Sequence, residues 1–232
     1  VGTIMLIMKK IPIYILAVGM VLSFNSCRKQ YEATEKDMAD YGWLLFEKAV
    51  GKSDYIDSKK WFTDSVNEDS TYMDGYNGLG WSNGILTDID SSIFYFEKGL
   101  KFSPNKFDTT NVRYELWAGL CFANNAKGLD VAAIAWGDSL IDGLSSGLAT
   151  NKWVFTHNNL NNKNKINHLD LRVTMAASNF AIGEFSKSVN HIQSILTELS
   201  GSTTFNPDVN LVSGRAELAV WIDSLSTILS NQ

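Results

Sequence analysis

The chain has 232 residues, of which 45% are hydrophobic and 19% are charged, and its formal net charge is -5 at pH 7. A chain of this length can bury one substantial core, and a mildly acidic balance without a basic stripe argues against a nucleic-acid partner. Cys27 and Cys121 are the two cysteines, and we expect no internal disulfide, with Cys121 as a small buried hydrophobe.

The first segment has the pattern of a secretory signal. Lys9 and Lys10 precede an apolar run over 11–24, and Cys27 follows shortly after it. This run is shorter than the about 20 apolar residues that a membrane-spanning helix needs, so a cleaved signal is favoured over a transmembrane anchor. A cysteine directly after the cut resembles the bacterial lipoprotein signal, in which the cysteine is lipidated and becomes the mature N-terminus. The relaxed sequence before Cys27 resembles that of Bacteroidetes-like bacteria.

The lipoprotein resemblance implies a division of the chain and a location. Residues 1–27 would be a signal peptide cleaved before Cys27, residues 28–35 a linker, and residues 36–232 a helical-repeat domain. Position 28 is Arg rather than Asp, and no acidic run follows Cys27. By resemblance to known sorting rules, we expect anchoring in the outer membrane through the N-terminal lipid, with the protein facing the periplasm. Buried acyl chains contribute about 0.8 kcal/mol per CH₂ to such an anchor.

Two segments repeat one spacing of residue types. Ser58 recurs as Ser92, and Phe62 recurs as Phe96 at the same interval along the chain. In each segment the small residue and the aromatic residue four positions later share one helical face. The interval equals the period of the tetratricopeptide repeat, about 34 residues, and residues 76–80 resemble the first helix of this family, with its glycine at Gly80. The spacing predicts helices over 55–65, 76–81 and 89–99.

Two further blocks and a last helix follow the same pattern. In the third block, residues 116–120 resemble a first helix and Ala132, Trp136 and Ser139 a second. The interval from Ser92 to Ala132 is longer than the repeat period, so we expect an insertion, in 105–110. An asparagine-rich polar connection over 150–167, which favours turns, leads to the fourth block, with helices over 171–180 and 185–195 and a turn at Gly183. A last helix over 212–229 would cap the stack.

We therefore predict an all-α fold. The resemblance covers about residues 36–230 and implies an α-α superhelix, a tetratricopeptide (TPR-like) solenoid of about four helical hairpins plus a C-terminal capping helix.

Several short motifs resemble catalytic or metal-binding sites, but we interpret them as structural features. Residues 143–147 match G-x-S-x-G, but a nucleophile elbow needs a strand before its serine, so we interpret Gly143 and Gly147 as a helix stop. His157, His168 and His191 form no pair with metal-ligand spacing. Met73 stands where a calcium loop over 67–75 would need an oxygen ligand. We predict no catalytic residue, no metal site and no cofactor, and hence no enzyme.

The tetratricopeptide resemblance implies binding through the inner faces of the first helices. The residues that it places in this groove are Trp43, Glu47, Asp74, Asn77, Trp81, Tyr114, Trp117 and Asp170, together with Val173 and Ala177. Whether Trp43 and Trp81 belong to the groove or to the core stays open. We expect a lipid-anchored scaffold or adaptor that binds a protein or peptide of the cell envelope. The alternative is a glycan- or nutrient-binding lipoprotein related to outer-membrane uptake systems.

Overall fold

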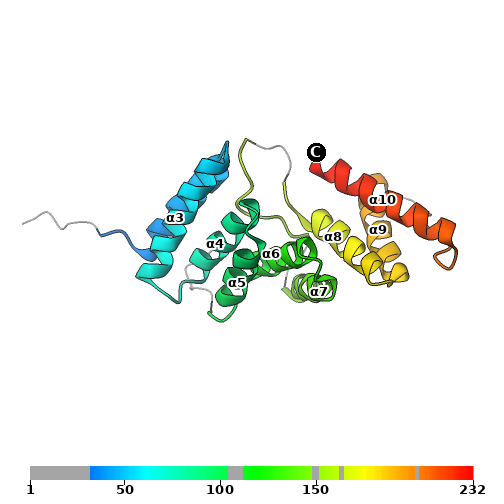
Figure 1. Cartoon of the computed structure of the whole chain (residues 1–232), viewed down its shortest axis with the longest axis horizontal. Coiled ribbons are helices and arrows are strands. Elements are labelled where there is room, and N and C mark those ends of the chain that lie inside the picture. The colour runs from blue at the N-terminus through cyan, green and yellow to red at the C-terminus, as the bar shows by residue number, and fades with distance from the viewer. Residues whose placement is uncertain (1–31, 104–111, 148–151, 162–164, 202–203, 232) are drawn as a thin grey trace, which may run out of the picture. The chain divides into compact units, whose positions relative to one another are not determined.

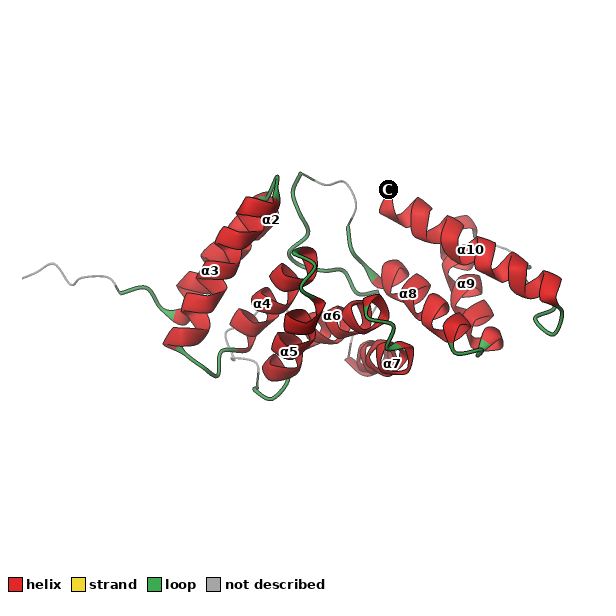
Figure 2. Ribbon diagram, viewed as in Figure 1, coloured by secondary structure: helices red, strands yellow, loops and turns green. Residues whose placement is uncertain are grey.

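Helices make up most of the part of the chain that the computed structural model describes, which is residues 32–103, 112–147, 152–161, 165–201 and 204–231 (Figures 1 and 2). No strand occurs in these residues, and Val154 and Asn167 form an isolated antiparallel bridge. The helices are α2 (Glu35–Lys48), α3 (Lys52–Glu68), α4 (Met73–Ile85), α5 (Ile89–Gly99), α6 (Val112–Ala126), α7 (Asp130–Gly147), α8 (His168–Ala181), α9 (Phe185–Ser200) and α10 (Val212–Ser230). The all-α prediction is confirmed for the described residues.

The helical domain begins where its first cap forms. Residues 34–232 are one structural unit, and residues 1–33 are a second unit of which the structure describes only Glu32 and Ala33. The predicted signal peptide and Cys27 therefore lie outside the described residues. Thr34 and Asp37 form a capping box, in which each side chain accepts a hydrogen bond from the backbone N–H of the other. This box starts α2 at Glu35, one residue before the predicted boundary.

Consecutive helices pack as pairs within residues 34–232. The pairs are α2 with α3, α4 with α5, α6 with α7, and α8 with α9, and α10 packs on α8 and α9. The first helices of neighbouring pairs also contact one another, whereas the second helices, in their described residues, do not. A layer whose helices touch while the other layer spreads apart is the inner layer, so α2, α4, α6 and α8 line an inner face. The four predicted pairs and the predicted last helix are all present.

One hydrogen bond repeats between the helices of a pair. Ser92 Oγ donates to the Gly80 carbonyl at 2.9 Å, and Ser188 Oγ donates to the Ala176 carbonyl at 2.8 Å. The two helices of a pair can approach closely enough for this bond only where the first helix carries a small residue. A Cβ at Gly80, for example, would lie 2.3 Å from the Phe96 ring. Ser58 makes the same bond to Gly42 in the first pair. The predicted core face of the second helices is therefore confirmed for the first, second and fourth pairs.

The third pair is shifted by one position from its prediction. Its second helix buries Ala133, Gly137 and Leu140, whereas the predicted Ala132, Trp136 and Ser139 are only half-buried. The interval from Ser92 to Ala133 equals the interval from Asn83 to Asn124. Ala133 and Asn124 therefore occupy in the third pair the positions of Ser92 and Asn83 in the second pair. The side chains of these two asparagines each donate to the carbonyl one turn earlier in their helices. The predicted insertion in 105–110 lies outside the described residues.

The shift could not be detected in the sequence because the third pair has no aromatic residue at the position of Phe62 and Phe96. Gly137 occupies the position of Phe96, and a Cβ there would lie 2.5 Å from Met175 Sδ. Met175 of α8 therefore fills the space that an aromatic ring fills in the second pair. Cys121 occupies the position of Gly80 and is fully buried, as predicted, and burial raises the pKa of its thiol to about 12.

The helix-stop interpretation is wrong for Gly143. This residue lies inside α7, which continues to Gly147. A Cβ at Gly143 would lie 2.8 Å from the Tyr114 ring and 2.9 Å from the Trp117 ring. Gly143 is therefore a packing residue that lets α6 approach α7. The predicted turn at Gly183 is confirmed, since this residue has a φ of +83° between α8 and α9.

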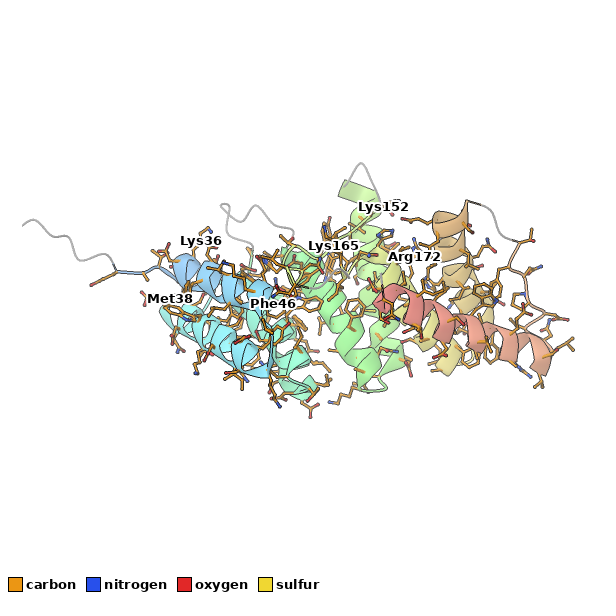
Figure 3. All side chains as sticks on the ribbon, turned by 90° about the horizontal axis from the view of Figure 1, so that it is seen from above. Lys36, Met38, Phe46, Lys152, Lys165 and Arg172 are labelled. Atoms are coloured by element: carbon orange, nitrogen blue, oxygen red, sulfur yellow. The ribbon has the colours of Figure 1, made fainter. Side chains whose placement is uncertain are left out.

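Two hydrophobic clusters meet at α8. Leu171 and Met175 belong to the cluster formed with α2 to α7, and Val173 and Ala176 belong to the cluster formed with α9 and α10. Side chains fill the space between neighbouring helices, with Phe46 in the first cluster (Figure 3). Among the helices that the structure describes, none combines the length and the apolar composition that crossing a membrane requires.

Candidate functional site

A segment that follows α7 lies across the inner face. Three hydrogen bonds to backbone carbonyls bind residues 152–161 to the end of α2. Leu160 N donates to the Glu47 carbonyl at 2.7 Å, and the side chains of Asn159 and Asn161 donate to the carbonyls of Ala49 and Lys48. The last carbonyls of a helix have no partner within the helix, so the segment satisfies the open end of α2. We call residues 152–161 the inner-face segment.

Alternate residues of the inner-face segment are buried. Trp153 and Phe155 are core residues, whereas Val154 between them is 50% exposed. The Phe155 ring centroid lies 4.2 Å from that of Trp81 and 6.1 Å from that of Trp43. Residues 153–155 of the connection predicted to be polar are therefore an extended, aromatic part of the core, whereas the turns expected from its asparagines occur at 156–157 and 160–161. Burial of every second residue is the period of an extended chain, and the alternation in residues 153–157 was the signal that could have revealed it.

The structure brings together most of the predicted groove residues but covers them. Trp43, Asp74, Asn77 and Trp81 are buried beneath the inner-face segment or within the core. Both tryptophans are thus core residues, the alternative that the sequence left open. Glu47 lies at the edge, where its carboxylate contacts His157.

Two predicted groove residues lie elsewhere, and a third lies at the start of α8. Tyr114 and Trp117 face α7, with Tyr114 Oη donating to the Gly143 carbonyl at 3.1 Å, so the structure does not bring them to the site. Asp170 accepts a hydrogen bond from Asn167 N at 2.8 Å in the capping box of α8. Burial raises the pKa of Asp170 above its usual value. Asp170 and Val173 both border a pocket on the inner face.

The most polar part of the inner face is a pair of buried carboxylates. Asp74 accepts hydrogen bonds from Trp43 Nε1 at 2.9 Å and from Asn77 Nδ2 at 3.2 Å. Glu115 accepts from Asn77 Nδ2 at 2.7 Å and from Thr156 N at 3.0 Å. The interval from Asp74 to Glu115 equals the one that relates the second pair to the third, so the two acids occupy the same position in their pairs. One amide, that of Asn77, connects the two carboxylates.

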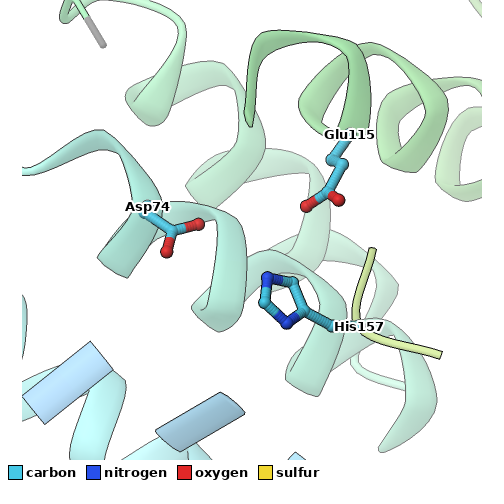
Figure 4. Close-up of side chains that lie close together, drawn as sticks. All are labelled: Asp74, Glu115 and His157. Carbon is cyan, nitrogen blue, oxygen red and sulfur yellow. The ribbon is translucent and has the colours of Figure 1, made fainter. Parts of the chain in front are cut away.

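His157 completes this cluster from the inner-face segment. Its ring is stacked on Trp43, with centroids 3.8 Å apart and an interplanar angle of 4°. Nδ1 lies 2.8 Å from Glu47 Oε1, and Nε2 is buried without a hydrogen-bond partner in the described part of the chain. One ligand atom from each of Asp74, Glu115 and His157 lies within 4.8 Å of the others (Figure 4).

Burial dominates the electrostatics of the cluster. Removal from water is the main cause that raises the pKa of Asp74 to about 6. The nearby His157 lowers this pKa, and the nearby Glu115 raises it further. Glu115 and His157 were not predicted as site residues. The recurrence of an acid at positions 74, 115 and 170 was a signal for Glu115. Sequence spacing held no signal for the meeting of His157 with the two acids, because it lies in a connection far along the chain.

A largely apolar pocket lies beside this cluster on the inner face. Its volume is about 410 Å³. Helices α4, α5, α6 and α8 supply its wall, the connection before α8 adds Ile166, and the last turns of α10 supply two serines. Its lining includes Trp81, Phe122, Ala126, Asp170, Val173 and Ser230.

No protein-family model matches the chain, and no curated protein matches it at a significant level.

Proposed function

We propose that this chain is a non-catalytic scaffold or adaptor that binds a protein or peptide partner in the cell envelope. The observation that carries the proposal is the pocket of about 410 Å³ on the inner face, whose wall includes Trp81, Phe122 and Val173. Ligand sites are concave, mostly apolar surfaces with a few polar groups. The pocket fits this description, with Asp170 as its acidic group.

The architecture that we propose for this function is a tetratricopeptide-like solenoid. Its support is the equal spacing of Ser58 with Ser92 and of Phe62 with Phe96, together with first helices that contact one another along an inner face. Extended concave surfaces are how stacked helical repeats bind their partners. An apolar side chain of a partner would enter the pocket, and a donor group beside it would face Asp170.

A peptide is favoured over the glycan alternative. The inner-face segment is itself a non-helical stretch of chain, extended over 152–155, that the inner face holds with aromatic side chains and hydrogen bonds. A sugar would need an open aromatic face to stack on. Trp43 and Trp81 are buried, and their rings already contact His157 and Phe155.

We propose a lipid anchor on Cys27 in the outer membrane, facing the periplasm. Its support is the basic pair, the apolar run over 11–24 and the cysteine that follows. Labelling cells with a palmitate analogue tests the anchor. The label should be sensitive to globomycin and absent from Cys27→Ser, and a label that persists in this variant would contradict the proposal.

Partner capture with a blocked pocket tests the binding function. Ala126 is exposed and lines the pocket, so Ala126→Trp fills the pocket without disturbing the core. Val131 of α7 is 70% exposed and does not line the pocket, and Val131→Trp is the matched control. Cross-linking in cells should recover the same envelope proteins with the wild type and with Val131→Trp, and none of them with Ala126→Trp. Recovery of no envelope protein by the folded wild type would overturn the function.

A further inference from the structure

The cluster beneath the inner-face segment has the composition of a metal site. It contains two carboxylates and one imidazole, and their ligand atoms lie within 4.8 Å of one another. Carboxylate oxygens and imidazole nitrogens bind zinc at about 2.0–2.2 Å in tetrahedral geometry, so two ligand atoms on one ion lie about 3.4 Å apart. Shortening these separations by up to about 1.4 Å would bring Asp74, Glu115 and His157 onto a common ion.

The histidine presents an unsatisfied nitrogen to the two acids. Nδ1 lies 2.8 Å from Glu47 Oε1, so Nε2 is the ring nitrogen that remains available to a metal ion. Nε2 is buried and makes no hydrogen bond within the described residues, and in Figure 4 this nitrogen faces Asp74 and Glu115. Two buried carboxylates that face one ring nitrogen are unfavourable without a positive charge between them. A bound cation would supply that charge.

An outer layer of donors holds each candidate ligand in place. Trp43 Nε1 and Asn77 Nδ2 donate to Asp74, and Asn77 Nδ2 and Thr156 N donate to Glu115. Glu47 orients the imidazole in the same way. Outer groups of this kind, a carboxylate behind a ligating histidine in particular, accompany metal ligands in proteins. Asn77 is fully buried, and its Oδ1 has no partner in the described structure, so the cluster has a second unsatisfied atom.

We propose that Asp74, Glu115 and His157 bind a divalent first-row transition-metal ion. Imidazole together with carboxylates suits zinc, manganese or iron, whereas calcium and magnesium prefer oxygen ligands alone. The ligands come from α4, α6 and the inner-face segment. A bound ion would therefore connect two repeats to the segment and hold it on the inner face. This site is independent of the pocket that carries the proposed function.

Metal titration of the purified full-length chain tests the site. The probe is Zn²⁺ added to chelator-treated protein at neutral pH, followed by calorimetry and by the thermal unfolding midpoint. We expect one equivalent to bind and the midpoint to rise, because a ligand that binds only the folded state stabilises it. Co²⁺ provides a second readout, since its visible absorption reports the ligands directly.

Four variants separate metal binding from folding. His157→Gln and Glu115→Gln each remove a ligand and should weaken binding by at least about tenfold. His191→Gln is the matched control, because His191 lies in α9 outside the cluster, and it should bind Zn²⁺ as the wild type does. If His157→Gln or Glu115→Gln fails to fold, Glu47→Gln keeps the ligands and should still bind about tenfold more weakly.

Two results would overturn the proposal. One is that folded wild-type protein binds no Zn²⁺ at concentrations up to about 1 mM. Protons alone would then neutralise the charge of the two carboxylates. The other is binding that His157→Gln, Glu115→Gln and Glu47→Gln leave unchanged in folded protein, which would assign the ion to other residues.

Discussion

At the scale of single residues, the paired helices approach closely at one small residue on each first helix. Gly80, Cys121 and Ala176 occupy this position in the second, third and fourth pairs. In the second pair the facing ring of Phe96 is fully buried, so the ring cannot move aside without opening the core. The absence of a side chain at Gly80 is therefore a requirement of packing and not of backbone conformation.

Replacement of Gly80 by alanine should destabilise the protein. The new methyl group would lie 2.3 Å from the Phe96 ring, and overpacking of this kind costs about 1–3 kcal/mol. Gly84 is the matched control, because it lies one turn later in α4 and a methyl group there would meet only Ser92, with its Oγ at 3.3 Å. Gly84→Ala should change stability by less than about 1 kcal/mol. Urea denaturation of both variants checks this, and equal losses would contradict the packing argument.

His191 should make the protein less stable in mildly acidic solution. Burial and the nearby Arg172 lower the pKa of His191 from 6.5 to about 4. The unfolded chain therefore binds a proton near pH 6.5 that the folded chain takes up only near pH 4. The stability that this group contributes is complete above pH 6.5 and is lost as the pH falls through 4. At about 1.4 kcal/mol for each tenfold change in proton affinity, the full effect is about 3 kcal/mol.

Urea denaturation between about pH 7 and pH 4 measures this contribution. Other groups titrate in the same range, so the informative quantity is the difference between the wild type and His191→Gln. The free energy of unfolding of the variant should fall less steeply with decreasing pH, because glutamine takes up no proton. Parallel curves would show that His191 has the same proton affinity in both states.

At the scale of elements, the inner-face segment acts as a further layer of the fold. Its Phe155 is 2% exposed and contacts aromatic rings of α2 and α4. Truncation of a buried phenylalanine to alanine costs about 3–5 kcal/mol, so Phe155→Ala should strongly destabilise the protein. Val154→Ala is the matched control and should cost little, because Val154 is 50% exposed. Urea denaturation gives both values.

Hydrogen exchange adds a test of how the segment is held. In Phe155→Ala, amides of residues 152–161 should exchange faster than in the wild type, since the ring fixes the segment to the inner face. Unchanged protection there, with lower stability elsewhere, would show that the asparagine bonds to the end of α2 hold the segment without the aromatic ring.

Helices could be predicted where one face repeats and is buried. The periodicity over 55–65, 89–99 and 185–195 identified α3, α5 and α9 because each buries a single stripe against its partner. The register of α7 was missed by one position, since Gly137 takes the place where the pattern requires an aromatic side chain. The helix itself was still found, because a shift of one position leaves the period unchanged.

The candidate site was harder to predict than the helices. The inner-face residues of α2 and α4 could be assigned by their repeat positions. The segment that covers these residues could not be predicted, because the many asparagines around residues 153–157 obscured a short extended pattern. The pairing of His157 with Asp74 and Glu115 depends on the path of the connection in space. No local preference in the sequence encodes that path.

At the scale of the whole unit over residues 34–232, stability should be distributed pair by pair. The two hydrophobic clusters share α8, which turns Leu171 to the earlier pairs and Val173 to α9 and α10. In stacked repeats each unit contacts only its neighbours, and stability is approximately a sum of units and their interfaces. The last helix therefore protects α8 and α9 directly, and the first pairs only through α8.

Truncation in the last helix tests this view. Leu225 of α10 is 1% exposed and belongs to the second cluster, and Leu225→Ala should cost about 2–5 kcal/mol. Val220, in the same helix and 65% exposed, is the control and should cost little. In hydrogen exchange, protection in Leu225→Ala should fall in α8, α9 and α10 and persist in α2 to α5. An equal fall in every helix would mean that the unit unfolds as one cooperative body, and that both clusters act as a single core.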